Sequence, residues 1–454
     1  MHRMQQRVDG TRIAELQGVV SGALEAARRL GADQAEAGAN LQQGLTVNVR
    51  LGEVDTVEYQ RDRGLGVTVY IGHRKGSAST ADLAPAAVQA TVAKACTIAR
   101  YTAEDPFSGL ADADMLAREV PDLELDHEWA IEPEDAVELA RRCEAAGRGV
   151  DGRITNSEGA SVTTHRGAHV YGNSLGFLAG YPSSSHSVSC ALVAQAGGDM
   201  QRDYWYAAAR DPAELGDIEA IGRCAGERAI ARLGARRLGT RRSPVLFVPD
   251  LARGVFSHLV AAVRGGSQYR RSSFLLDAAG TQILPSCIHL RERPHIPKAL
   301  ASSPFDAEGV ATRDRELVAG GILQGYVLGS YAARKLGLRS TGNAGGVHNL
   351  LVESSGETGS FEQLIARMGR GLIVTELMGQ GVNGVTGDYS RGASGFWVED
   401  GAIAFPVEEV TIAGNLRDMY RAIEAVGNDV DSRGAIRTGS LLVAEMTIAG
   451  AAQS

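Results

Sequence analysis

Residues 371–419 read GLIVTELMGQGVNGVTGDYSRGASGFWVEDGAIAFPVEEVTIAGNLRDM and form the least random part of the chain. Glycines divide this stretch into short apolar runs, at positions 371, 379, 381, 384, 387, 392, 395, 401 and 414. Such spacing is typical of strands joined by tight loops, because glycine reaches positive φ without strain. Charged and aromatic residues lie among these glycines. The stretch therefore predicts a sheet whose loops carry functional side chains.

One motif inside this stretch suggests a nucleotide site. Gly379-Gln-Gly381-Val-Asn-Gly384 matches G-x-G-x-x-G. That fingerprint requires a strand before it and a helix directly after it. The apolar run 372–377 supplies the strand, but residues 385–395 contain three further glycines and no helical apolar period. We therefore favour a strand–loop–strand segment over a nucleotide-binding loop.

Length and composition narrow the class of protein. The 454 residues exceed one ordinary core and predict two or three domains. A net charge of −8 argues against direct nucleic-acid binding, which normally needs a basic face. The sequence has no leader-like apolar segment and no apolar run of about 18 residues, so we expect a cytoplasmic protein without a membrane span. The five cysteines are scattered and none follows Cys287, which disfavours disulfides and a cysteine-based metal site.

Hydrophobic periodicity along the chain predicts an α+β fold in two domains. We expect an N-terminal domain of helices and antiparallel sheet, and a β-rich C-terminal domain with a few helices. The basic run 236–244 marks the main boundary, so the C-terminal domain spans 241–454. The N-terminal half is divided into a subdomain at 1–110 and a middle subdomain at 111–240. Helices are predicted at 13–30, 85–101, 133–147, 218–233, 251–263, 330–336 and 361–368, and strands at 45–51, 54–61, 64–71, 245–248, 323–328 and within 439–450.

Two short runs have more than one interpretation. Residues 183–186, Ser-Ser-Ser-His, are interpreted as a serine-rich turn. Neighbours in sequence rarely have the geometry of a nucleophile and its base, so a catalytic pair is the weaker reading. The aromatic run 204–206 suits a domain seam and a sheet edge packed on a helix equally well.

No complete catalytic constellation is visible, but several long motifs resemble a known family. They are Gly180-Tyr-Pro-Ser-Ser, Met200-Gln-Arg-Asp-Tyr-Trp, Ser330-Tyr-Ala-Ala-Arg-Lys, Ser340-Thr-Gly-Asn-Ala-Gly-Gly, Thr375-Glu-Leu-Met-Gly-Gln-Gly-Val-Asn and Thr386-Gly-Asp-Tyr-Ser-Arg-Gly-Ala. Over nearly the whole chain, they resemble the PmbA (TldE) branch of the TldD/PmbA family. The resemblance implies a two-domain α+β fold and a heterodimeric zinc-dependent protease that acts on unfolded or extended peptides. The older name of the family, modulator of DNA gyrase, is an indirect consequence of that processing.

The zinc motif of the family is degenerate in this sequence. The resemblance implies that the TldD subunit holds zinc through an H-E-x-x-x-H helix and a later cysteine. The matching stretch here is His258-Leu259-Val260-Ala261-Ala262-Val263, in which Leu259 replaces the general-base glutamate and Val263 replaces the second histidine. Zinc needs three or four donors, and its water needs a base. We therefore predict no catalytic residue and no metal in this chain, and zinc in a TldD-type partner.

The glycine-rich stretch is then a candidate surface for a peptide or a partner. Extended peptides bind by adding a strand to an exposed sheet edge. We assign this surface to the loop and strand residues Gly379, Gly381, Asn383, Asp388, Tyr389 and Arg391. Asp388, Tyr389 and Arg391 fit an alternative equally well, in which they pin the glycine loops by hydrogen bonds.

These observations support one function and a rival. The first is a cytoplasmic, non-catalytic subunit that assembles with a TldD-type catalytic subunit and captures extended or unfolded peptides. The rival is a non-proteolytic, peptide-binding regulatory protein that acts as a homodimer. Neither function requires direct contact with nucleic acid or with a membrane.

Overall fold

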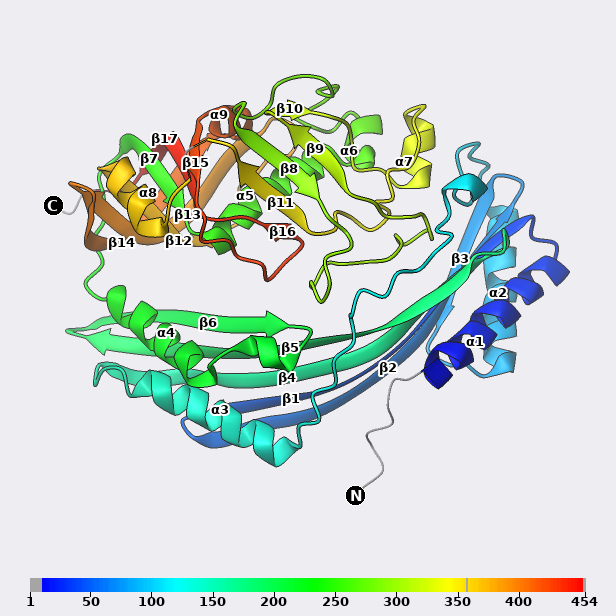
Figure 1. Cartoon of the computed structure of the whole chain (residues 1–454), viewed down its shortest axis with the longest axis horizontal. Coiled ribbons are helices and arrows are strands. Elements are labelled where there is room, and N and C mark those ends of the chain that lie inside the picture. Colours follow the sequence, from blue (N-terminus) through cyan, green and yellow to red (C-terminus); the bar gives the residue numbers. More distant parts are fainter. Residues whose placement is uncertain (1–9, 357, 452–454) are drawn as a thin grey trace.

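The computed structural model describes residues 10–356 and 358–451. Figure 1 shows two halves: a long, curved sheet with its helices, and above it a C-terminal half built from two further sheets. Helices and strands are both abundant, and the sheets are largely antiparallel, so the predicted α+β fold class is confirmed. Within the described residues, none of the helices combines the length and the apolar character needed to cross a bilayer.

The N-terminal half is organised around one six-stranded antiparallel sheet, in the order β3-β2-β1-β4-β5-β6. Its strands are β1 (Gln34–Arg50), β2 (Glu53–Ile71), β3 (Arg74–Thr80), β4 (Ile154–Asn173), β5 (Leu178–Ala196) and β6 (Asp199–Ala209). The sheet unites strands that precede and follow the irregular segment between residues 102 and 132. Among the described elements, that segment contains only the short 3-10 helix Ala113–Met115.

Four helices cover one face of this sheet in two pairs. They are α1 (Gly10–Arg29), α2 (Pro85–Tyr101), α3 (Pro133–Arg148) and α4 (Ile218–Ala231). The first pair packs on Ala35 and Ala37 of β1, and the second pair packs on Val47 and Val49. These positions are odd-numbered on one strand, and alternate side chains of a strand share a face. The opposite, concave face is therefore left for the C-terminal half (Figure 1).

The C-terminal half contains a six-stranded sheet that closes on itself. Its order is β14-β13-β12-β7-β17-β15, and β14 also pairs with β17. Its strands are β7 (Arg241–Phe247), β12 (Gly371–Met378), β13 (Asp388–Glu399), β14 (Ala402–Asn415), β15 (Ile423–Val426) and β17 (Leu441–Ala449). The glycine-rich stretch thus supplies three adjacent strands, as its strand–loop–strand pattern predicted.

A second, five-stranded sheet and five helices complete this half. The sheet has the order β10-β9-β8-β11-β16. Its strands are β8 (Ile288–Glu292), β9 (Arg315–Ala319), β10 (Ile322–Leu323), β11 (Leu350–Ser354) and β16 (Ile436–Arg437). The helices are α5 (Pro249–Ala262), α6 (Gly265–Tyr269), α7 (Ser330–Lys335), α8 (Phe361–Met368) and α9 (Leu416–Arg421).

Two local predictions are wrong. Residues 183–186 are not a turn but part of β5, where Ser184 Oγ donates to the carbonyl of Arg210 at 2.9 Å and a ring nitrogen of His186 lies 2.8 Å from the carbonyl of His127. Those internal bonds satisfy polar side chains that looked like turn residues. Of the predicted strand 323–328, only Leu323 lies in a strand, because Val327 N–H bonds instead to Val263 O.

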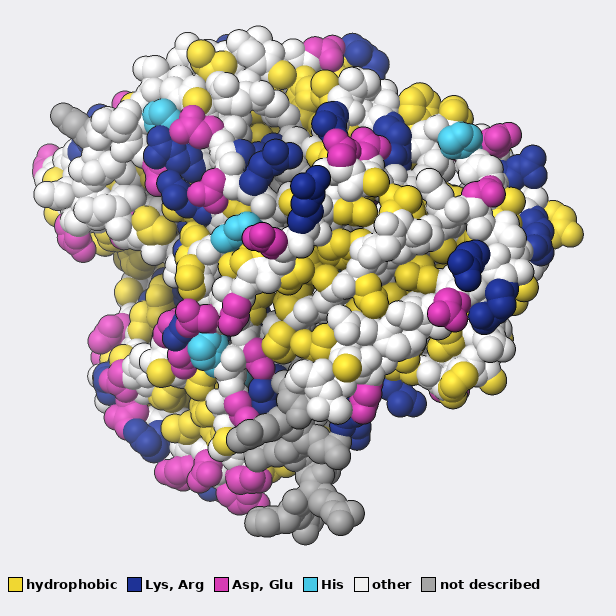
Figure 2. Space-filling view, turned by 45° about the vertical axis from the view of Figure 1, so that its right-hand side comes forward, with side chains coloured by type: hydrophobic (Ala, Val, Ile, Leu, Met, Phe, Trp, Pro, Cys, Tyr) yellow, Lys and Arg dark blue, Asp and Glu magenta, His cyan; other side chains and the backbone are white. Residues whose placement is uncertain are grey.

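The two halves are held together by arginines at their seam. The Arg433 guanidinium lies 4.1 Å from the ring centroid of Tyr206 and donates to the Tyr206 carbonyl at 2.6 Å. Trp205 lies under Arg228 of α4, 5.1 Å from its guanidinium. The aromatic run 204–206 therefore serves both of its proposed purposes, a domain seam and a helix contact. Hydrophobic side chains gather along the middle of the molecule between the upper and lower parts in Figure 2.

Candidate functional site

Helix α5 carries the degenerate motif and is fixed in the core of the C-terminal half. It follows β7 directly and begins at Pro249, whose ring suits the first turn of a helix. Leu259 and Val263 are both fully buried, and the Tyr420 hydroxyl donates to the Val255 carbonyl at 2.9 Å. The two positions that would supply a base and a second ligand therefore point into packed apolar surroundings.

His258 leaves this core and meets the glycine-rich stretch. Its ring contacts that of Tyr389 on β13 edge to face, with centroids 6.1 Å apart and planes at 75°. Arg391 follows Tyr389 by two residues and so lies on the same face of β13. Sequence reasoning treated the helix and the stretch as separate features, and the structure joins them.

Burial and one charge set the ionisation of this cluster. Burial lowers the pKa of His258, and the nearby Arg391 charge lowers it further. Burial also raises the pKa of Tyr389 to about 12, although the Arg391 charge opposes that rise. At neutral pH the cluster therefore consists of a neutral imidazole, a neutral phenol and one guanidinium cation.

The polar atoms of this cluster have few hydrogen-bond partners. Tyr389 Oη and Arg391 Nε are buried, and apart from the interaction between the Arg391 guanidinium and the phenol they have no hydrogen-bond partner among the described residues. Among the residues that the structure describes, no carboxylate forms an ion pair with Arg391, and the His258 ring makes no hydrogen bond. Buried polar groups are nearly always hydrogen-bonded in native proteins, so the small number of partners of these atoms needs an explanation.

The loop before Tyr389 is bonded quite differently. Thr386 Oγ1 donates to Asp388 Oδ2 at 2.6 Å, and Asn415 Nδ2 donates to Asp388 Oδ1 at 3.3 Å. Asn383 Oδ1 accepts from the Val385 N–H at 2.9 Å. Asp388 and Asn383 thus pin the loop, whereas Tyr389 and Arg391 do not.

The glycines of the loop are needed for the backbone. Gly379 has a φ of +76°, which favours glycine. A Cβ on Gly381 would lie 2.0 Å from the carbonyl oxygen of Ser390, whose N–H bonds to the Gly381 carbonyl at 2.7 Å. The motif that resembled a dinucleotide fingerprint is therefore a close backbone crossing, and β13, not a helix, follows it.

A free strand edge lies beside this loop, but it is short. β12 pairs with β7 through Leu372, Ile373 and Val374, and with β13 as far as Met378. Residues 375–378 are therefore unpaired on the β7 side. Thr375 Oγ1 is buried there without a partner, and Met378 is 46% exposed. Most of the stretch thus lies inside the sheet. Among the described residues no strand pairs with the other edge of residues 375–378, where Glu376 forms an ion pair with Arg232.

The residues around His258 do not fit a zinc ion. A zinc site takes three or four nitrogen, sulfur or oxygen donors. His258 offers one imidazole, while Leu259 and Val263 cannot ligate, and the neighbouring Arg391 adds a positive charge. Across the described part of the chain, no group of three histidine, cysteine, aspartate or glutamate side chains is placed to hold a metal.

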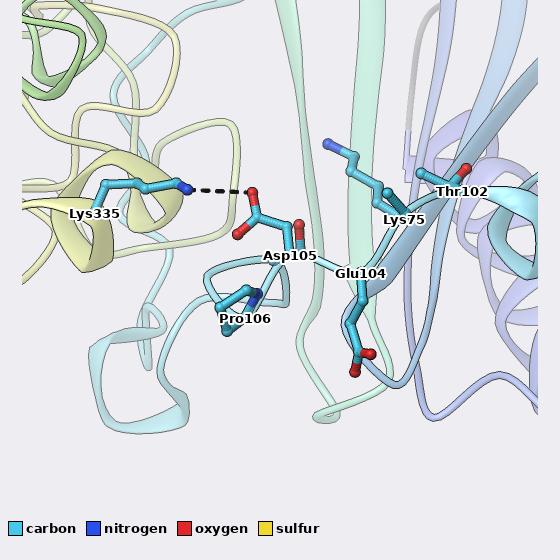
Figure 3. A pocket seen from close by; sticks show the side chains of 8 residues that line it. Lys75, Thr102, Glu104, Asp105, Pro106 and Lys335 are labelled. Carbon is cyan, nitrogen blue, oxygen red and sulfur yellow. Dashed lines mark ion pairs between the residues drawn. The ribbon is translucent and has the colours of Figure 1, made fainter.

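Two hollows elsewhere on the surface are polar and open. One, of about 550 Å³, is lined by Lys75, by residues 102–106, by Ser108 and by Lys335. In Figure 3, Lys335 points to Asp105, an ion pair of 3.5 Å, while Glu104 points away from it. Asp105 also accepts from the Tyr331 hydroxyl at 2.7 Å, so this hollow borders a clamp between the two halves.

The other hollow, of about 300 Å³, lies over the ends of β1, β4, β5 and β6. Its lining includes Asn48, Ser161 and Ser189, which are opposite one another on adjacent strands. The sheet therefore presents a row of small polar side chains at this place.

Comparison with known proteins shows the family to which this chain belongs. Models of the PmbA/TldA metallopeptidase match residues 35–99 (domain 1), 126–233 (central domain) and 240–450 (C-terminal domain). This chain belongs to the PmbA/TldD family. The C-terminal match contains both α5 and the glycine-rich stretch.

Individual members of the family are similar over nearly their full lengths. Metalloprotease PmbA of Escherichia coli O157:H7 is 51% identical over 435 residues, 96% of each chain. A metalloprotease PmbA homologue of Haemophilus influenzae is 48% identical over 436 residues, again 96% of each chain.

Solved structures show the same fold. A Bacteroides thetaiotaomicron protein, proposed to be a modulator of DNA gyrase, superposes with a TM-score of 0.91 at 26% identity, over 96% of this chain and 99% of that one. TldE from Thermococcus kodakarensis superposes with a TM-score of 0.83 over 95% and 100%, and at 21% identity it shows the fold alone.

Proposed function

We propose that this chain is the non-catalytic subunit of a cytoplasmic TldD/TldE-type zinc metalloprotease, and that it serves assembly and the capture of extended peptides. One observation carries the proposal: α5 keeps His258 but buries Leu259 and Val263 where a base and a second ligand would stand. A metal-bound water needs several ligands and a proton acceptor, and this helix supplies one imidazole. Zinc and its base then belong to a TldD-type partner.

The outer part of β2 supports an assembly role. β3 pairs with β2 only from Leu65 to Ile71, so within residues 10–356 and 358–451 no strand pairs with this edge of residues 53–64. Val54, Val57 and Tyr59 on this segment are 44%, 41% and 60% exposed. A free edge with exposed apolar side chains is a surface that a partner chain covers. We assign it to the TldD-type subunit.

The free edge at residues 375–378 supports peptide capture. An extended peptide that adds a strand there gains backbone hydrogen bonds without any demand on its sequence. Because this edge is short, further contacts with the peptide must come from neighbouring side chains or from the partner subunit. The row of small polar side chains on the concave face of the N-terminal sheet offers further hydrogen-bonding groups.

Reconstitution tests the proposal. The chain is mixed with a family member that has an intact His-Glu-x-x-x-His helix, and the mixture is assayed by size exclusion and by cleavage of an unstructured peptide. We expect a heterodimer, cleavage by the mixture and none by this chain alone. Tyr59→Lys should weaken the heterodimer without changing the melting temperature of the free chain.

Two outcomes would contradict the proposal. Cleavage by this chain alone would show that it has its own catalytic centre. A stable homodimer that binds peptides and ignores the partner would favour the rival function, a non-proteolytic regulatory protein.

A further inference from the structure

Arg391 differs from Arg315 and Arg433, two other partly buried arginines, in having no carboxylate beside it. Arg315 pairs with Glu292 at 2.7 Å, and Arg433 pairs with Asp431 at 2.9 Å. Arg391 is partly buried, its Nε is enclosed, and no described carboxylate forms an ion pair with it. A partly buried charge without a partner is unfavourable, and proteins retain such a group where a ligand completes it.

Two neutral donors stand next to this cation. The Tyr389 hydroxyl is buried and has no partner other than the Arg391 guanidinium among the described residues. The Tyr389 ring packs against His258, whose ring makes no hydrogen bond within the described residues. Guanidinium, hydroxyl and imidazole N–H groups all donate to oxygen. The cluster thus offers donors and one positive charge, with no acidic group to compete for them.

We propose that Arg391, Tyr389 and His258 form a binding site for a carboxylate, the acid group of a peptide that the chain captures. A planar guanidinium binds a planar carboxylate through two parallel hydrogen bonds, and the hydroxyl adds a third. A cation is excluded by the charge of Arg391. Beside the one histidine that the degenerate motif retains, this chain has a guanidinium, whose charge favours an anion over a metal cation.

The sheet register connects this site to the free edge of β12. Met378, the last paired residue of β12, lies opposite Gly392, the neighbour of Arg391. Adjacent strands are about 4.8 Å apart, so a peptide strand added to residues 375–378 would lie about 10 Å from the Arg391 backbone. A terminal or side-chain carboxylate of that peptide would have to cover this distance along the face of the sheet to reach the guanidinium. This choice of ligand rests on the proposed capture of peptides.

A matched set of labelled hexapeptides tests the site on the full-length chain by fluorescence anisotropy. One peptide has a free C-terminal carboxylate and no acidic side chain, the second is its C-terminal amide, and the third is the amide with one internal glutamate. We expect at least one acid-bearing peptide to bind about tenfold or more tightly than the plain amide. The tighter of the two identifies the source of the carboxylate.

Variants show whether the preference arises at this site. Arg391→Met should abolish it, Arg391→Lys should retain part of it, and Tyr389→Phe should reduce it. Arg437→Met is the matched control, because Arg437 Nε is also buried and unpaired but the residue lies on β16. That control should leave the preference unchanged, and melting temperatures confirm that each variant is folded.

A small probe separates this inference from peptide capture. N-acetyl-alanine carries one carboxylate, and it should shift the NMR signals of the His258 ring in the wild-type chain but not in Arg391→Met. Equal binding of all three peptides, with no shift by N-acetyl-alanine, would overturn the carboxylate site and leave peptide capture intact. A shift without any peptide binding would support the site and contradict the proposed capture.

Discussion

Residues 383–388 and residues 389–391 of the glycine-rich stretch are adjacent in sequence, but their polar side chains differ in how many hydrogen bonds they make. In the loop, Asp388 and Asn383 have their oxygens occupied by Thr386, Asn415 and backbone N–H groups. One residue later, Tyr389 and then Arg391 present buried donors without acceptors. Satisfied side chains hold the loop in shape, and unsatisfied ones are available to a ligand. We therefore propose that the two alternatives left open for this set apply to different members: Asp388 and Asn383 hold the loop, and Tyr389 and Arg391 bind a ligand.

The largest expected effect concerns stability and tests whether the backbone crossing at Gly381 holds the loop. Gly381→Ala places a Cβ 2.0 Å from the Ser390 carbonyl oxygen and should destabilise the C-terminal half by about 1–3 kcal/mol. Gly384→Ala is the matched control from the same motif, since nothing lies within 4 Å of its Cβ position. Urea unfolding measures both variants. Equal midpoints would mean that the backbone crossing does not hold the loop.

The next prediction compares the changes in the free energy of unfolding that follow substitution of Asp388 and of Arg391. Asp388→Ala loses the hydrogen bonds from Thr386 and Asn415, and should lower the free energy of unfolding by about 0.5–1.5 kcal/mol. Arg391→Met removes an unpaired, partly buried charge, and should leave stability unchanged or raise it by up to about 1 kcal/mol. Thermal unfolding compares them. A larger loss in Arg391→Met would show that the arginine is structural.

The smallest effect concerns the ionisation of His258. The Arg391 charge lowers the His258 pKa, so Arg391→Met should raise it, as measured by NMR titration of the imidazole. A histidine whose folded pKa lies below its unfolded value of 6.5 stabilises the fold above that value, and the contribution is lost as the pH falls through the folded pKa. The variant should therefore lose less stability on acidification below pH 6.5. An unchanged pKa would place Arg391 too far from His258 to share a site.

Local signals in the sequence predicted much of the fold. Pro85 marked the start of α2, and glycine spacing marked the strands of the closed sheet. Such signals fail where tertiary bonds override them. The serines at 183–185 read as a turn because their partners, such as Arg210, lie elsewhere in the chain.

The candidate site was only partly accessible from the sequence. The degenerate motif identified His258, and the glycine-rich stretch identified Tyr389 and Arg391, but no local pattern joined them. Their contact depends on how β13 lies in the sheet and on how α5 packs against it, which are properties of the folded chain. The lack of hydrogen-bond partners likewise became visible only with the side chains in place.

We propose that this chain holds no zinc of its own, and the zinc content of the purified chain tests this proposal. The chain is purified without a partner, equilibrated with zinc, desalted and analysed by mass spectrometry for metal per chain. We predict fewer than about one zinc in ten chains, because one imidazole beside a guanidinium cannot hold the ion. One zinc per chain, lost in His258→Ala, would show that this chain has a metal site of its own.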